Sequence, residues 1–396
     1  MATGSRRVDV CVVGLGPTGR ALAHRSAQAG LRVAAVDPRP DRIWTPTYSA
    51  WLDELPSWLP PSVVASRIEA PTVWTTTERK IERPYVVLSK PRLFDALPLD
   101  DVQIEAQRAT ALTARRVTLA DGADIEADIV VDTRGLPKTD RRPAASAHGI
   151  FVEAQRVEHY VGAGEGLLLD WRPENGATND EPPSFLYSVP IGDGTVIFEE
   201  TTLGVPGGLT QHELRRRVVT RLAAHGISLT GDEPHESCHY PLDQPPPRRL
   251  RDKESAVAFG SRGGMMHPCT GYSVADSLAL TDAFVDALLS GTDPVAALWP
   301  AKARFVYWMR ERGLAGMGRL TTEQATAMFD SFFRASPRQQ RALLTEHADP
   351  FGLATVLVGT VAHTWPFRWR FDLVGWSNRN RWGKYTAQQQ VSTRKR

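Results

Sequence analysis

The sequence predicts an α/β fold with three parts: a parallel-sheet domain at the N-terminus, a second domain with a mixed sheet, and a helical C-terminal extension. A buried strand, a glycine turn, a helix and a second strand follow one another over residues 8–36. Strand-like runs recur at 151–170 and 184–203, and the spacing of apolar residues becomes helical from residue 272 onward. The 396 residues, 42% apolar and 23% charged, suffice for two or three globular domains.

Hydrophobic periodicity and turn residues place each element in order. The predicted elements of the first 135 residues are a strand at 8–13, a helix at 20–29, a strand at 32–36, a Pro- and Trp-rich irregular excursion at 44–61, a helix at 92–97, and short strands near 102–104, 116–119 and 129–131. The later elements are strands within 151–170 and 184–203, a helix at 211–225, a strand at 256–260, and helices at 272–290, 296–312, 322–334 and 337–346. The predicted domains are a discontinuous first domain at 5–135 plus 253–295, a second at 136–252, a helical region at 296–385 and a basic tail at 386–396.

The turn after the first strand reads Gly14-Leu15-Gly16-Pro17-Thr18-Gly19. Gly14 permits the tight turn, Gly16 lets a pyrophosphate approach the backbone, and Gly19 lets the helix pack closely on the sheet. Asp37 closes the second strand, where a carboxylate holds the ribose hydroxyls of a dinucleotide. The pattern predicts a Rossmann-type site in which this turn, including Pro17 and Thr18, binds a cofactor at a helix N-terminus.

Two later segments favour FAD over NAD as that cofactor. Residues 128–135, which include Asp132, resemble the strand and turn that pass beneath the flavin in two-domain flavoproteins. Residues 260–268, beginning with Gly260, resemble the late flavin-contacting segment of those proteins. Many flavin hydroxylases carry a Gly-Asp pair there, but Ser261 stands in place of the acid, so hydroxylation is less expected.

Two adjacent carboxylates, Glu199 and Glu200, interrupt an otherwise apolar strand at 195–202. Consecutive side chains of a strand point to opposite faces, so at least one of the two should lie where water is scarce. Burial favours a protonated carboxyl at neutral pH, which suits a proton donor. The alternative is that one glutamate pairs with an arginine and the other is solvated.

Four segments together resemble one family. They are Tyr48-Ser49-Ala50-Trp51-Leu52-Asp53-Glu54, Arg83-Pro84-Tyr85, Phe198-Glu199-Glu200-Thr201 and His267-Pro268-Cys269-Thr270-Gly271-Tyr272-Ser273. Residues 169–172 add a further piece. Because these segments occur in the order of the family's motifs, the chain resembles the lycopene cyclases, whose fold is shared with aromatic hydroxylases and geranylgeranyl reductases.

The resemblance implies a redox-neutral isomerisation with reduced FAD, for which NAD(P)H is the reductant. An acid protonates the end of an acyclic carotenoid such as lycopene, and a β-ionone ring closes. Glu199 matches the first carboxylate of the family motif and is the predicted acid, with Glu200 as its alternate. Electron-rich walls stabilise such a cation, and the expected substrate contacts are Tyr48, Trp51, Asp53, Glu54, Trp171 and Tyr187. The further expected cofactor contacts are Arg92, His267, Pro268, Thr270, Gly271 and Tyr272.

Two rival functions stay open at this point. A flavin-dependent monooxygenase or isoprenoid reductase would consume NAD(P)H in step with product, whereas a cyclase needs reductant only to prime its flavin. A catalytically silent carrier of an apolar polyene would bind its ligand and form no product under any flavin state.

Charge and cysteine content limit the partners. A net charge of +2 gives no case for nucleic acid, and Cys11, Cys238 and Cys269 are too few and scattered for a disulfide framework or a metal site, so a reducing cytoplasm is expected. Residues 365–396 hold eight Lys or Arg, one acid and seven aromatic residues. This mixture suits either peripheral contact with the inner face of a membrane or a helix packed on the body.

Overall fold

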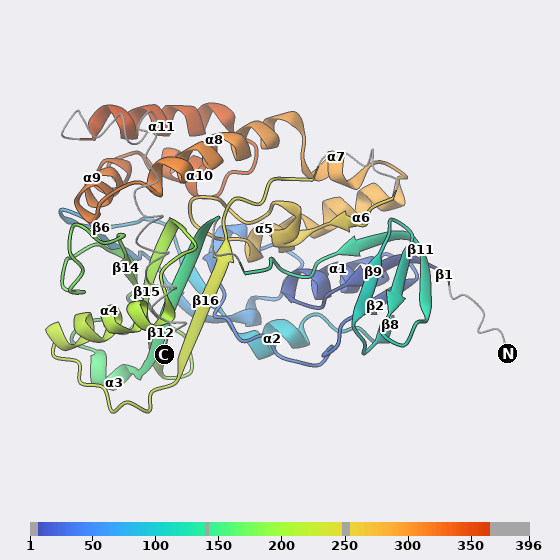
Figure 1. Ribbon diagram of the computed structural model, residues 1–396, viewed down its shortest axis with the longest axis horizontal. Coiled ribbons are helices and arrows are strands. Elements are labelled where there is room, and N and C mark those ends of the chain that lie inside the picture. Colours follow the sequence, from blue (N-terminus) through green and yellow to red (C-terminus); the bar gives the residue numbers. More distant parts are fainter. Residues whose placement is uncertain (1–6, 139–141, 248–253, 365–396) are drawn as a thin grey trace.

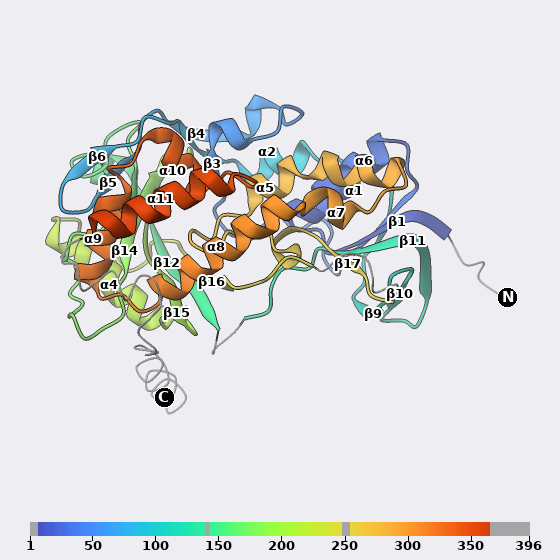
Figure 2. The ribbon, with the colours of Figure 1, turned by 90° about the horizontal axis from the view of Figure 1, so that it is seen from above.

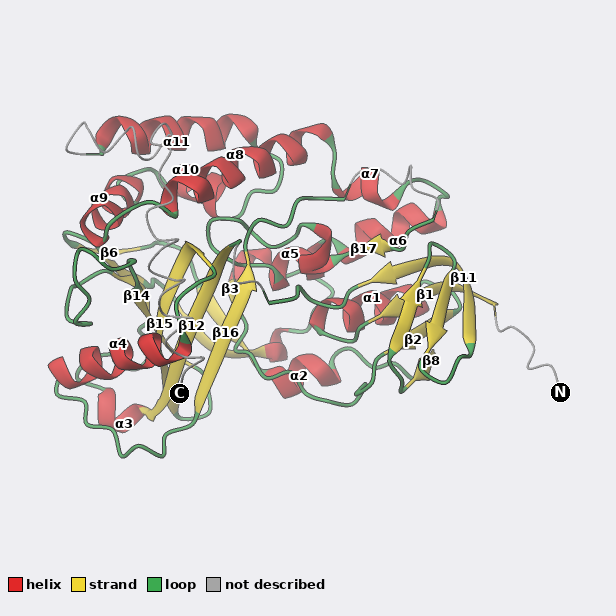
Figure 3. Ribbon diagram, viewed as in Figure 1, coloured by secondary structure: helices red, strands yellow, loops and turns green. Residues whose placement is uncertain are grey.

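The computed structural model describes residues 7–138, 142–247 and 254–364. Within these ranges the strands form two seven-stranded sheets and one three-stranded sheet (Figure 1). The two larger sheets lie side by side along the long axis of the molecule, and the C-terminal helices cover the second one (Figure 3). The predicted α/β class, with two sheets and a helical C-terminal part, is confirmed.

The first sheet is built around β1 (Arg7–Val13), which pairs in parallel with β2 (Val33–Val36) and with β11 (Asp124–Asp132). Its other strands are β8 (Val102–Glu105), β9 (Ala109–Leu112), β10 (Arg116–Leu119) and β17 (Val257–Ala258). Apolar clusters cover both faces, so β1 is an almost continuous apolar run. The glycine turn leads from β1 into α1 (Pro17–Gln28), as predicted.

The second sheet has the order β16-β12-β15-β14-β13-β5-β6. The bounds of its strands are β5 (Thr72–Trp74), β6 (Glu78–Lys80), β12 (Pro143–Glu153), β13 (Leu167–Asp170), β14 (Phe185–Pro190), β15 (Thr195–Pro206) and β16 (His235–Pro241). The predicted domain division is wrong for β5 and β6, which it placed in the first domain. They join the second sheet because β5 pairs with β13, a partner far away in the chain.

The three-stranded sheet begins in the region predicted to be irregular, residues 44–61, and takes its other two strands from residues further along the chain. It consists of β3 (Ser49–Trp51), β7 (Tyr85–Leu88) and β4 (Val64–Ile68), in that order. Short 3₁₀ turns at Leu52–Glu54 and Pro61–Val63 account for the rest of the excursion. The strands form because Trp51 and Tyr85 are buried partners across the β3–β7 pair, with ring centroids 5.1 Å apart.

The helices after residue 272 differ from the predicted ones in their division and at their ends, and the helix at Pro350–His363 was not among those predicted. Their bounds, with those of three earlier helices, are α2 (Lys90–Asp95), α3 (Ala154–Val157), α4 (Gln211–Ala224), α5 (Val274–Ala279), α6 (Thr281–Leu289), α7 (Pro294–Leu298), α8 (Ala301–Met317), α9 (Thr322–Phe332), α10 (Pro337–Leu344) and α11 (Pro350–His363). The predicted helix at 272–290 is divided into α5 and α6. Seen from above, α8 and α11 lie next to each other over the second sheet (Figure 2).

Among the described residues, no helix is long and apolar enough to span a bilayer. The basic and aromatic segment at 365–396, for which contact with a membrane is predicted, lies outside the described residues.

Helix α4 packs on the second sheet, and two of its arginines, Arg217 and Arg221, are wholly buried. The Arg221 Nε donates to Glu200 Oε2 over 3.0 Å, and both side chains are shielded from water. Asn175 Nδ2 and Ser184 Oγ donate to Glu200 Oε1 over 2.7 and 2.6 Å. The carboxylate is therefore fully hydrogen-bonded, the condition under which a buried charge is tolerated.

Replacing Arg221 with Ala should lower the free energy of unfolding by about 3–5 kcal/mol, because Glu200 would be left as an uncompensated buried charge. Urea denaturation followed by circular dichroism measures this loss. Arg215→Ala, on the exposed face of the same helix, should change stability by less than about 0.5 kcal/mol. Equal effects of the two substitutions would contradict the assigned role of the buried pair.

Candidate functional site

A cavity of about 440 Å³ lies against the second sheet and is closed by the three-stranded sheet, by the loop before α5 and by α9 and α10. Its volume is in the range of small-molecule sites. Apolar and aromatic side chains make up most of the wall, including Leu168, Phe185, Phe329 and Phe333. Such a wall selects an apolar ligand or the apolar end of a longer one.

Strand β15 sends its two glutamates in opposite directions. Glu199 lines the cavity, whereas Glu200 lies on the other face of the sheet against α4, in the ion pair with Arg221. The predicted alternate, Glu200, is thus removed from the cavity, because adjacent strand residues point to opposite faces. The alternative interpretation, that one glutamate pairs with an arginine and the other is solvated, is correct in its first part, because Glu200 pairs with Arg221.

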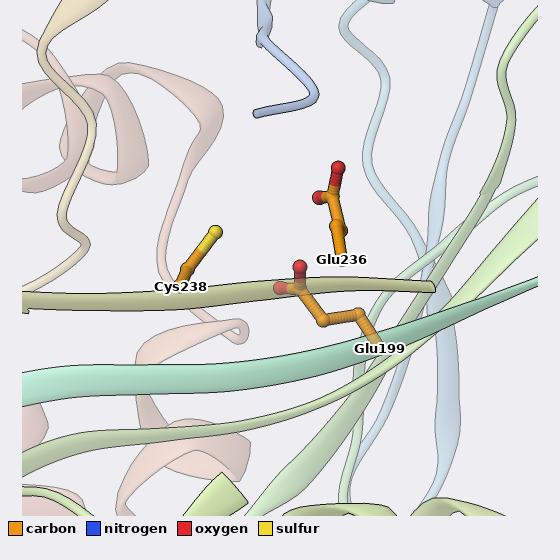
Figure 4. A group of neighbouring side chains, drawn as sticks. All are labelled: Glu199, Glu236 and Cys238. Atoms are coloured by element: carbon orange, nitrogen blue, oxygen red, sulfur yellow. The ribbon is translucent and has the colours of Figure 1, made fainter. Parts of the chain in front are cut away.

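Two residues that the sequence reasoning missed stand beside Glu199. Glu236 and Cys238 come from β16. One carboxylate oxygen of Glu199, one of Glu236 and the Sγ of Cys238 all lie within 4.8 Å of one another (Figure 4). Thr201 Oγ1 donates to Glu199 Oε1 over 2.9 Å. Thr47 donates to Glu236 Oε2 from its backbone N and its Oγ1, over 3.1 and 2.9 Å.

Burial controls the protonation of this group. It raises the pKa of Glu199 to about 8, and the nearby charge of Glu236 acts in the same direction. Burial also raises the pKa of Glu236, against the bonds from Thr47 and the charge of Lys90. The pKa of the Cys238 thiol is raised by burial and by both carboxylates. At neutral pH Glu199 therefore carries a proton and Cys238 is a thiol.

A row of phenols forms another part of the wall. Tyr85 donates to Ser49 Oγ over 2.8 Å, and Ser49 Oγ lies 2.9 Å from the hydroxyl of Tyr187. The Tyr85 hydroxyl also lies 3.2 Å from the Tyr272 hydroxyl. Burial raises the pKa of all three tyrosines, so they stay neutral. Neutral aromatic rings offer the cavity electron-rich faces without a fixed charge.

The glycine turn has the geometry of a dinucleotide site. Gly14 has φ +99°, and a Cβ on Gly19 would collide with Gly14 O and Thr133 Oγ1. A Cβ on Gly16 would meet nothing within 4 Å, so the backbone there is open to an incoming group. Asp37 accepts from the Leu15 N–H over 2.8 Å at the same edge of the sheet. These residues fit an ADP-containing cofactor at the N-terminus of α1.

The profile of the family described as lycopene cyclase protein matches residues 9–364. The chain belongs to the lycopene cyclase family. A lycopene beta cyclase, chloroplastic, from an Oncidium hybrid cultivar is 30% identical over an alignment of 379 residues, which covers 86% of this chain and 78% of that protein. The family assignment suggested by the four sequence motifs is thereby confirmed.

Solved structures show how widely the fold is used. A geranylgeranyl bacteriochlorophyll reductase-like protein from Thermoplasma acidophilum has a TM-score of 0.62 at 13% identity, covering 92% of this chain and 98% of its own. A variant of Klebsiella pneumoniae HpxO, complexed with FAD, has a TM-score of 0.55 at 13% identity, covering 78% and 90%. At these identities the likeness establishes the fold alone, which this chain shares with both proteins.

The motifs that resemble the lycopene cyclase family contribute unequally to the cavity. Tyr48 and Trp51 line it, but Asp53 and Glu54 do not. Arg83 donates to Asp53 Oδ1 over 2.9 Å and to Glu54 Oε1 over 2.5 Å. Arg341 Nη1 lies 2.8 Å from Asp53 Oδ2. The acidic pair joins the excursion to α10 and is not part of the lining, contrary to the expectation of substrate contact.

Trp171 is likewise displaced from the cavity of this lycopene cyclase homologue. It packs behind Phe185 and Phe329, with ring centroids 5.1 and 5.3 Å away. Those two phenylalanines line the cavity instead. The sequence could not reveal this exchange, because Phe329 belongs to α9, which carries none of the family motifs.

Both ring nitrogens of His267 form hydrogen bonds within the protein, so neither is left for a cofactor. Its Nε2 lies 2.7 Å from Leu343 O, and its Nδ1 accepts from the backbone N–H groups of Cys269 and Thr270 over 3.1 and 3.2 Å. Burial lowers the pKa of His267 well below its usual value, so the ring is neutral. Pro268 is outside the lining, whereas Thr270, Gly271 and Tyr272 are part of it.

Three other residues expected to contact the cofactor, Asp132, Gly260 and Arg92, lie in different environments. Asp132 is buried and forms ion pairs with Arg134 and Arg262, at 2.8 and 2.9 Å. Gly260 has φ +71°, and a Cβ there would press on Thr18. Arg92 is exposed on α2. Gly260 thus lets the late segment approach the glycine turn, as a shared cofactor site requires.

Replacing Asp37 with Ala should raise the dissociation constant for FAD by about 10- to 100-fold, because hydrogen bonds to a carboxylate contribute roughly 1.5–3 kcal/mol. Titration of the apoprotein with FAD, followed by quenching of flavin fluorescence, measures this change. Asp41→Ala, an exposed carboxylate in the next loop, is the matched control and should bind FAD normally. Unaltered affinity in the Asp37 variant would argue against a ribose contact.

Proposed function

We propose that this chain is a lycopene β-cyclase that closes a β-ionone ring at the acyclic end of lycopene, or of a related polyene, by acid catalysis without net redox change. The observation that carries the proposal is Glu199, a carboxyl with a raised pKa that projects into an apolar and aromatic cavity. An alkene is a weak base, so its protonation needs a positioned acid that is still protonated at neutral pH.

The proposed first step transfers the Glu199 proton to the terminal trisubstituted alkene. The O–H bond breaks, a C–H bond forms, and a tertiary cation remains on the neighbouring carbon. The next alkene of the chain attacks this cation, which forms the ring C–C bond and moves the positive charge into the ring. Loss of one ring proton to a base then gives the neutral product, so no atom or electron is gained overall.

The walls of the cavity have two tasks in this scheme. The rings of Tyr85, Tyr187 and Tyr272 stabilise the cation through their electron-rich faces. The apolar wall keeps water from capturing the cation, which would give an alcohol instead of a ring. Hydrogen bonds among the phenols and Ser49 hold the aromatic wall in one arrangement.

FAD bound at the glycine turn would, when reduced, supply negative charge near the cavity. Gly14, Gly16, Gly19 and Asp37 are the residues that would hold it, together with the backbone N–H groups at the start of α1. NAD(P)H stays the predicted reductant. The predicted location at the inner face of a membrane rests on residues 365–396 and stays a prediction.

A second candidate is a monooxygenase or isoprenoid reductase working on an apolar substrate. The fold of the reductase-like protein from Thermoplasma acidophilum favours it, because similar folds serve redox enzymes. Counting NAD(P)H oxidised per product molecule separates the candidates. A cyclase uses reductant only to prime the flavin, whereas a reductase or monooxygenase uses one equivalent for every turnover.

Glu199→Gln should abolish ring formation, with a loss of at least about 10²–10⁴-fold, because an amide cannot supply the proton. The unsubstituted protein and the Glu199→Gln variant are each expressed in a lycopene-accumulating bacterial host, and the pigments are separated and identified by absorbance and mass. The active protein should give products of unchanged mass with a shortened chromophore. Glu153→Gln, an exposed glutamate of β12, serves as the control and should cyclise normally. Normal product from the Glu199 variant would remove this mechanism.

The rate of cyclisation should fall as pH rises through the raised pKa of Glu199. Its protonated form is the donor, so the acid is fully present below that pKa, about 8, and is lost above it. The rate should then drop about tenfold for each further pH unit. Initial rates with detergent-dispersed lycopene and prereduced protein measure the profile. A rate that climbs with pH over the same range would contradict a proton-donating role.

A further inference from the structure

We propose that Glu236 is the proton-sharing partner of Glu199, and that Gly149 lets the two carboxyl groups meet so that they hold one proton between them. This inference deepens the proposed cyclisation and rests on it for its chemical purpose. It names a positioning residue, Glu236, which acts through Glu199. It also assigns a reason for a glycine in the middle of a long central strand.

The pairing of strands places the three residues in one row. In the second sheet β12 lies between β15 and β16, and Gly149 of β12 is paired with Glu199 on one side and with Glu236 on the other. Residues in register share a face of the sheet, so all three project toward the cavity side. Two strand spacings separate the glutamate Cα atoms by roughly 10 Å.

The missing side chain of Gly149 allows the carboxyl groups to cross that distance. A Cβ built on Gly149 lies 2.8 Å from Ile197 Cδ1 and 3.4 Å from Glu236 Cγ. An alanine methyl at this place would collide with Ile197, which shares the cavity-side face of β15 with Glu199, and would touch the stem of Glu236. With this place empty, Glu199 extends across β12 toward β16, and a carboxyl oxygen of Glu199 and one of Glu236 lie within 4.8 Å of each other (Figure 4).

The hydrogen bonds around the pair decide where the proton lies. Thr47 sends both of its donors to the same oxygen of Glu236, Oε2. Two donors suit an ionised carboxylate, and they leave its other oxygen available to a donor from Glu199. The proton on Glu199 therefore points to Glu236, a hydrogen bond that helps to raise the pKa of Glu199 and acts against burial at Glu236, whose pKa burial nevertheless raises.

The surroundings favour a single proton in the pair. Facing it are the neutral groups Tyr187 from β14, and Cys238 and Tyr240 from β16, whose pKa values are all raised by burial. Lys90 is a cation that acts on Glu236. One positive charge nearby can balance one carboxylate, but two ionised carboxylates at this distance would repel each other in a dry site.

The shared proton suits a reaction that adds one proton and removes another. When Glu199 gives its proton to the alkene, the pair carries two negative charges and faces a new cation, which it stabilises. When the ring loses its proton, that C–H bond breaks and either carboxylate accepts the proton. The pair then again holds one proton, so each turnover leaves it as it began.

The test follows the protonation of Glu199 directly, so it does not depend on cyclisation. Infrared spectra of the full-length FAD-bound protein, recorded as a function of pH, contain the band of the protonated Glu199 carboxyl, identified by its loss in Glu199→Gln. In the unsubstituted protein this band should persist to pH values well above the ordinary range of a glutamate. In Glu236→Gln its midpoint should move to lower pH by about one unit or more, since the neighbouring charge is gone. Glu153→Gln should leave it unchanged.

A second variant tests the role of the glycine. Gly149→Ala should push the carboxyl groups apart, so the Glu199 midpoint should again fall to lower pH. In both variants the alkaline limit of the cyclisation rate should move in the same direction. Normal FAD content and a normal unfolding temperature would show that the fold is intact.

Three results would overturn the proposal. The first is a Glu199 band that already titrates in the ordinary range. The second is a midpoint that does not move in Glu236→Gln. The third is activity that disappears on treatment with a chelator and returns with Zn²⁺ alone, which would make Glu199, Glu236 and Cys238 a metal site. Failure of cyclisation itself is distinguishable, because lycopene would then stay unchanged while the infrared titration still showed the shared proton.

Discussion

The buried ion pair between Glu200 and Arg221 fixes the orientation on which the candidate site depends. Because side chains alternate along a strand, holding Glu200 against α4 also determines the direction of Glu199. A change of register by one residue would exchange the two, burying Glu199 beneath the helix and sending Glu200 into the cavity. The pair therefore contributes through specificity more than through net stability, since the desolvation of two charges offsets much of their attraction.

The same sheet excludes water from the cavity, and this burial sets the protonation states of the groups that line it. Glu199 accepts a bond from Thr201, which favours its ionised form, yet burial outweighs that bond and keeps the carboxyl protonated. The phenols and the Cys238 thiol respond to burial in the same direction, so the wall is polar in places but carries little charge. This is a setting in which a single proton transfer changes the local field strongly.

The periodicity of apolar residues along the chain predicted those elements whose formation depends on neighbouring residues. The β1 strand, the glycine turn and α1 follow from a periodicity that neighbouring residues set, and the structure reproduces them within three residues at each end. Pairing between distant segments was beyond reach: nothing in Thr72–Trp74 indicates that β13 is its partner, and His235–Pro241 is polar enough to hide Glu236 in an unpromising stretch. Sequence motifs also could not separate contact from support. His267 and Trp171 belong to family-like segments, but one ties the loop to Leu343 and the other stands behind Phe185.

The route of the chain through its sheets has a consequence for the making of chimaeras. Strands β5 and β6 are donated to the second sheet from within the N-terminal sequence, and β17 returns late in the chain to the first sheet. A cut near residue 136 would therefore leave the second sheet without its edge and the first without β17. A chimaera of two relatives that exchanges the cavity therefore has to take residues 72–80 and the block that follows residue 142 from the same parent.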